Sequence, residues 1–80
     1  MERNVELMHT LLLKVQREER PGGFMEPDND VDSQHFKFLK DLRLIEAFSK
    51  TDRGGLVWFA QGLTNEGYAV VEGRRPLLGR

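Results

Sequence analysis

Two histidines are the side chains of this 80-residue chain best suited to acid–base chemistry near neutral pH. His9 and His35 fall in different predicted helices, and His35 lies on the apolar side of its helix. A histidine in that position is more often a hydrogen-bonded core residue than a general base. Ser33 and Ser49 are predicted to be loop or capping residues, because neither stands at the sharp strand-to-helix turn that exposes a nucleophilic serine. The sequence therefore predicts no enzyme active site.

An acidic stretch ahead of the second predicted helix is the other candidate for chemistry. Asp28, Asp30 and Asp32 have the spacing of the first three ligands of a calcium-binding loop. Ser33 then follows where the loop needs glycine, and Leu39 occupies the twelfth position, which needs a bidentate carboxylate. We therefore expect no metal and no cofactor. The stretch is expected to be a solvated loop in which Asp30 or Asp32 caps the next helix, with an acidic contact for a basic partner as the alternative.

Composition indicates a single globular domain over residues 1–80, with flexible ends at 1–3 and 76–80. Hydrophobic residues make up 39% of the chain and charged residues 31%, which is typical of folded proteins. The lack of cysteine excludes disulfides and thiolate chemistry and favours a cytoplasmic location. The sequence contains no secretory signal and no apolar run of about 18 residues, so we expect no membrane partner.

The net charge of −1 argues against strong binding of nucleic acid, because lysines and arginines that neutralise phosphates supply most non-specific affinity. The distribution of charge is more informative. Residues 33–80 hold eight basic against five acidic side chains, so the second half of the chain is modestly basic.

The first element is predicted to be a helix from Asn4 to about Glu19. Asn4 is a plausible N-cap, and Pro21 and the glycines after it stop the helix. Leu7 and Leu13 lie beside the main apolar stripe and either widen the buried face or form a dimer seam. Phe24 and Met25 are predicted to form a short strand that pairs with the later hairpin. The main stripe has helical spacing and consists of Val5, Met8, Leu11, Leu12 and Val15.

The second helix, predicted over residues 31–43, has the strongest segregation of apolar and polar side chains. One face carries Val31, His35, Phe38, Leu39 and Leu42, and the opposite face carries Gln34, Lys37, Lys40 and Arg43.

A β-hairpin is predicted to follow, with strands over 44–49 and 56–63 and a turn over Lys50 to Gly55. On its second strand, Val57 and Phe59 face one way while Leu56, Trp58 and Ala60 face the other. One of these apolar faces must cover the helices, and the other is exposed unless a partner covers it. A last helix begins after Thr64 and ends before Pro76.

This order of helix, short strand, helix, hairpin wing and C-terminal helix predicts an α+β fold of the winged-helix type. The pieces that support it are the opening MERNVELMHTLLLKV, the middle residues His35, Leu39, Leu42, Leu44, Ile45, Glu46 and Ala47, and the later residues Leu63, Thr64, Gly67 and Tyr68. In these pieces, over most of residues 1–75, the chain resembles a family of small uncharacterised phage and prophage proteins with a winged-helix fold. The resemblance implies that fold and a phage origin, and brings no established activity or site.

The chain departs from this family at the end of the second helix, where Arg43 stands in place of a glycine. The wing and the helix ahead of His35 also look shortened.

Two functions are compatible with these features, and we favour a DNA-binding regulator acting in the host cytoplasm as a homodimer. Double-stranded DNA would be bound by Gln34, Lys37, Lys40 and Arg43 on the second helix and by Lys50 and Arg53 at the wing. The alternative is a phage inhibitor or adaptor that acts by contact with a host protein. Its apolar anchors would be Leu56, Trp58 and Phe59.

Overall fold

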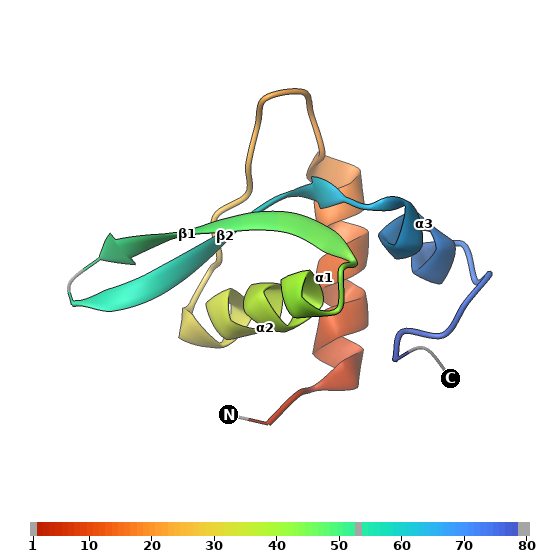
Figure 1. Ribbon diagram of the computed structural model, residues 1–80, viewed down its shortest axis with the longest axis horizontal. Coiled ribbons are helices and arrows are strands. Elements are labelled where there is room, and N and C mark those ends of the chain that lie inside the picture. The colour runs from red at the N-terminus through yellow and green to blue at the C-terminus, as the bar shows by residue number, and fades with distance from the viewer. Residues whose placement is uncertain (1, 53, 79–80) are drawn as a thin grey trace.

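A computed structural model of the chain describes residues 2–52 and 54–78. The chain forms an α+β domain with three helices and one two-stranded antiparallel hairpin (Figure 1). None of the helices in these two ranges is both long and apolar enough to cross a membrane. The elements follow the order α1 (Val5–Glu18), α2 (Asp30–Asp41), β1 (Ile45–Asp52), β2 (Gly55–Leu63) and α3 (Asn65–Val71).

Helix α1 confirms the predicted cap and most of the predicted stripe, whereas Val5 in its first turn is 45% exposed. The Asn4 side chain accepts a hydrogen bond from the Leu7 N–H, and Met8, Leu11, Leu12 and Val15 are buried. Leu7 packs against the core, whereas Leu13 remains 43% exposed, so the buried face is widened on one side only. The Lys14 ammonium donates to the Asp28 carboxylate at 2.8 Å and so ties the 19–29 loop to α1, and this hydrogen bond raises the pKa of Lys14 above 10.5.

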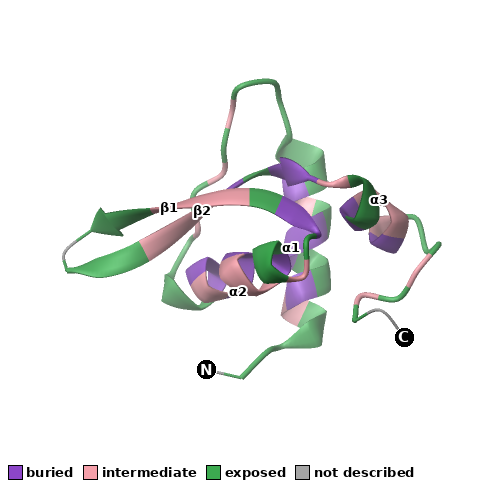
Figure 2. Ribbon diagram, in the orientation of Figure 1, coloured by how far each residue is buried: buried purple, intermediate pink, exposed green. Residues whose placement is uncertain are grey.

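Helix α2 corrects two predictions. Its N-cap is Asn29, whose Oδ1 accepts from the Asp32 N–H at 2.9 Å, and neither Asp30 nor Asp32 has this role. Its buried side is also broader than the predicted stripe, because α1 and the hairpin both pack on it (Figure 2). Phe36 is completely buried, whereas Val31 is 43% exposed.

Helix α2 ends at Asp41, so Arg43 lies beyond it, in the left-handed region with φ of 62°. The Leu44 N–H reaches back to the Leu39 carbonyl at 2.9 Å, and the Arg43 N–H bonds the Lys40 carbonyl at the same distance. These two bonds define a Schellman motif, whose left-handed residue is usually glycine. Arg43 thus stands where the backbone favours a glycine.

The hairpin is longer than predicted, because β1 continues to Asp52 and β2 begins at Gly55. Lys50 therefore lies within a strand and not in the turn. Gln61 is an extra residue on β2, since Ala47 pairs with Ala60 and Glu46 pairs with Gly62. The predicted short strand at Phe24 and Met25 is confirmed as a single bridge between Met25 and Ala60.

The core lies between the two longer helices and one face of the hairpin. Ile45, Ala47, Trp58 and Ala60 belong to that face. The short α3 closes one end, and Thr64 caps it by accepting from the Gly67 N–H at 3.1 Å.

Candidate functional site

His35, the main catalytic candidate by residue type, lies inside the fold. It is 1% exposed, its Nε2 accepts from the Asn4 N–H at 3.0 Å, and its Nδ1 lies 2.7 Å from the Val31 carbonyl. A proton on Nδ1 and a free lone pair on Nε2 satisfy both contacts, so this geometry fits the neutral ring. The imidazole joins the start of α1 to α2 and has no free nitrogen with which to act on a substrate.

The three aspartates ahead of α2 do not converge. Asp28 pairs with Lys14, Asp32 is buried at the start of the helix, and Asp30 is exposed. Within residues 2–52 and 54–78, no three His, Cys, Asp or Glu side chains are close enough to hold a metal ion.

The basic residues proposed for DNA are only partly brought together. By helical spacing the outermost strip of α2 carries Asp30, Gln34, Lys37 and Asp41, and the Lys37 ammonium pairs with the Asp41 carboxylate at 2.9 Å. Lys40 lies beside this strip, with its ammonium 5.5 Å from the centre of the Trp58 ring. The outward face of α2 is therefore a mixture of acidic, polar and basic side chains.

The wing residues lie elsewhere. Lys50 pairs with Val57 across the hairpin and extends over the Phe48 ring at 5.9 Å, on the face of the sheet away from α2. Arg53 lies outside the described residues. The structure thus gathers Gln34, Lys37 and Lys40 on one helix and separates Lys50 from them.

The three proposed apolar anchors do not share a surface. Trp58 faces α2 and packs against the core, Leu56 is 58% exposed further along the same face, and Phe59 lies on the opposite face. Phe59 stacks on Phe48 with ring centres 5.3 Å apart, and Phe24 meets both rings edge-on. This aromatic triad was not predicted from the sequence, although two phenylalanines in facing strands are a signal for a cross-strand pair.

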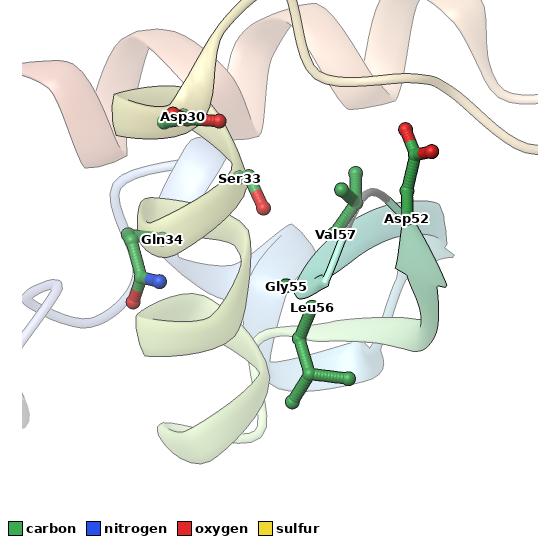
Figure 3. Close-up of a pocket in the computed structure, with 7 residues that line it drawn as sticks. All are labelled: Asp30, Ser33, Gln34, Asp52, Gly55, Leu56 and Val57. Carbon is green, nitrogen blue, oxygen red and sulfur yellow. The ribbon is translucent and has the colours of Figure 1, made fainter.

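A groove separates the first half of α2 from the outer half of the hairpin (Figure 3). It has a volume of about 660 Å³ and is partly open to solvent. In Figure 3 the Leu56 side chain points away from the side on which Asp52 and Val57 project. The residues that line the groove are Asp30, Ser33 and Gln34 from α2 and Asp52, Gly55, Leu56 and Val57 from the hairpin.

The β2 backbone supplies hydrogen-bonding groups along this groove. Ala60 exchanges two hydrogen bonds with Met25 on the outer edge of β2, and the Trp58 N–H donates to the Ser33 Oγ at 2.9 Å. Every second residue of a strand directs its N–H and carbonyl to the same edge, so those of Leu56 point away from β1, as those of Ala60 and Trp58 do. The groove therefore combines a short open strand edge with the carboxylates of Asp30 and Asp52.

On the far side of the domain, the Tyr68 hydroxyl donates to the Glu19 carboxylate, which raises the pKa of that phenol above 10.0. This contact ties α3 to the residue after α1 and is remote from the groove.

Comparison with known proteins gives one informative match. The chain is 31% identical over 78 residues to an uncharacterized protein of Haemophilus influenzae strain Rd. The match covers 90% of this chain and 66% of that relative, so the chain spans slightly less than two thirds of the relative's length. No protein-family model and no solved structure matches the chain.

Proposed function

We propose that this domain is a non-enzymatic module that binds an extended segment of a partner protein in the groove between α2 and β2. The observation that carries the proposal is the open backbone edge of β2 at Leu56, which lies inside a groove of suitable shape. Addition of a strand to an exposed edge is a common mode of peptide recognition, in which backbone hydrogen bonds give affinity and flanking side chains give specificity.

The charges around the groove favour a basic partner. Asp30 and Asp52 come from opposite walls and are both exposed, and neither forms an ion pair with another described residue. Exposed Leu56 supplies an apolar contact on the other side of the strand from Asp52. A partner segment that alternates basic and apolar side chains would match this arrangement.

We also infer that the fold is a reduced winged helix of phage or prophage origin, as the resemblance implies. The order of α1, the Met25 bridge, α2, the hairpin and α3 supports the fold, with α2 as the single helix between the bridge and the hairpin. The partner of such a protein would be an enzyme or defence complex of the host.

An arrayed library of decapeptides with lysine or arginine at alternate positions tests the groove directly. Peptides that bind should shift the amide resonances of Leu56 and Ser33 in nuclear magnetic resonance spectra. Asp30→Asn or Asp52→Asn should weaken binding about fivefold, the effect of roughly 1 kcal/mol for an exposed charge pair. Asp41→Asn, which alters a carboxylate outside the groove, is the matched control. Binding that leaves Leu56 and Ser33 unperturbed, or no binding by any peptide, would exclude the groove as the site.

DNA binding through α2 is a second candidate, and Arg43 is the observation in its favour. A residue other than glycine at φ of 62° carries a conformational cost, and such costs cluster at functional sites. Arg43 and Lys40 are both exposed near the end of α2, where their cations could contact phosphates.

Fluorescence anisotropy with a mixed-sequence duplex separates the two candidates. Contacts from Lys37, Lys40 and Arg43 to three phosphates predict a slope of roughly −3 for log affinity against log salt, and each alanine substitution should reduce the slope by about one. Lys14→Ala is the control for a lysine outside α2. A duplex that does not bind at about 50 mM salt would eliminate this candidate.

A further inference from the structure

The outer edge of β1 is a second interaction surface, separate from the groove. Among the described residues β1 pairs only with β2. The N–H and carbonyl of Ala60 point away from β1, so those of its partner Ala47 point away from β2. By alternation along the strand, the N–H and carbonyl groups of Ser49 and Thr51 also point away from β2. Their outward N–H and carbonyl groups have no hydrogen-bond partner within residues 2–52 and 54–78, and the side chains from Lys50 to Asp52 are exposed.

We propose that β1 pairs with β1 of a second copy of this chain in antiparallel orientation, about a two-fold axis at Phe48, to form a four-stranded sheet. In this register Ala47 of each copy faces Ser49 of the other, and the two pairs exchange about four backbone hydrogen bonds. This interface is independent of the groove, which uses the opposite edge of the hairpin.

The charges on β1 select this register. With Phe48 opposite its own copy, each Lys50 faces a Glu46, so the pair of strands gains two opposite-charge contacts. Neither side chain has an ion-pair partner among the described residues, and both are exposed. Shifting the partner strand in one direction places Glu46 opposite Asp52 and then Lys50 opposite itself, so like charges meet. The first shift in the other direction places Glu46 opposite Phe48 and Lys50 opposite Leu44, so both opposite-charge contacts are lost.

The aromatic triad continues through the same axis. Phe48 lies on the uncovered face of the sheet, stacked on Phe59 and contacted by Phe24. The two Phe48 residues would form a non-hydrogen-bonded pair, in which the Cα atoms are only about 4.5 Å apart and side chains contact directly. Two triads would then join into one apolar strip across the dimer.

Lys50 also disfavours the pairing of this edge with unrelated strands. A lysine protects an open edge because an incoming strand must leave its charge unpaired or desolvated. The self-complementary register is an exception, since it supplies Glu46 opposite the ammonium. The edge is therefore selective for its own copy.

A charge exchange tests the register. We expect the wild type to dimerise in sedimentation equilibrium, and Lys50→Glu or Glu46→Lys alone to weaken the dimer roughly tenfold to hundredfold by placing like charges opposite each other twice. An equimolar mixture of the two variants should restore association, because both contacts become attractive in the mixed dimer. Lys37→Glu, which makes the same change of charge on α2, should have no effect. Circular dichroism confirms that each variant is folded.

A wild type that remains monomeric at about 1 mM, or a mixture that associates no better than the separate variants, overturns the proposal. A second measurement does not depend on charge. The chain has no cysteine, so Phe48→Cys should oxidise rapidly to a disulfide-linked dimer, since a non-hydrogen-bonded pair on the axis has the required Cβ separation. Lys50→Cys lies off the axis and should cross-link much more slowly. Equal rates for the two variants would exclude the register.

Discussion

Arg43 and Gly73 occupy equivalent positions in the Schellman motifs that end α2 and α3. Their comparison predicts that Arg43→Gly stabilises the protein. Each follows the C-cap of a helix with a positive φ, 62° for Arg43 and 79° for Gly73. In each case the next N–H reaches back five residues, from Leu44 to Leu39 at 2.9 Å and from Arg74 to Ala69 at 2.8 Å. The hydrogen bonds are equivalent, so the difference lies in the conformational cost of the left-handed residue.

The magnitude follows from two opposing terms. A left-handed conformation costs a residue with a Cβ about 1–2 kcal/mol, and glycine avoids this cost. Glycine also loses more backbone entropy on folding, which reduces this gain in stability by about 0.5–1 kcal/mol. The net gain in free energy of unfolding is expected to be about 0.5–1 kcal/mol. For a domain of this size, that gain raises the melting temperature by roughly 2–8 °C.

Urea unfolding followed by circular dichroism measures the effect. Arg43→Ala is the matched control, because it removes the guanidinium and keeps the left-handed Cβ, and its stability should stay close to that of the wild type. Gly73→Ala should show the reverse effect and lose about 1 kcal/mol. If Arg43→Gly is no more stable than Arg43→Ala, the conformational argument is wrong. If Arg43→Ala is less stable than the wild type, the arginine side chain itself stabilises the fold.

Two further substitutions test the packing that positions α2 and α3. Gly67→Ala should cost at least about 3 kcal/mol in urea unfolding, because a Cβ there would lie 2.1 Å from the Leu44 carbonyl oxygen. Gly55→Ala is the control, because its Cβ would lie 4.0 Å from the Asp52 carbonyl oxygen, and equal stabilities would contradict the close contact at Gly67. His35→Leu should cost about 1–3 kcal/mol, because it leaves the Asn4 N–H without its acceptor and removes the contact of the ring with the Val31 carbonyl. A thermal melt within about 2 °C of the wild type would show that these hydrogen bonds contribute little.

The elements that local chemistry specifies could be predicted from the sequence. The cap at Asn4 and the stripe of α1 depend on residues within one helix; the cap is confirmed, and so is the stripe except for Val5. The sequence does not show which residue is the N-cap of α2, because Asn29, Asp30 and Asp32 all have side chains that can accept a hydrogen bond from an N–H of the first turn. Only the path of the loop decides among them.

Burial and side-chain direction depended on tertiary contacts that periodicity does not contain. A single stripe predicted that Val31 is buried and left Phe36 out, whereas α2 is covered from two sides. The direction of Lys50 depends on the length of β1, which continues through a segment that resembles a turn in composition. The groove requires α2 and β2 to be placed relative to each other, so no spacing in the sequence indicates it.

The two edges of the hairpin account for both proposed surfaces. A two-stranded sheet has an open edge on each strand, and exposed edges are sites of strand addition. The chain covers part of the β2 edge with Met25 and Ser33 and leaves Leu56 in the groove. It covers none of the β1 edge from Ala47 to Thr51 with another described strand. Self-pairing of β1 would leave the groove as the open edge of each subunit, so a dimer would present two identical sites to a partner, and a divalent partner would bind it more tightly than a monomeric variant.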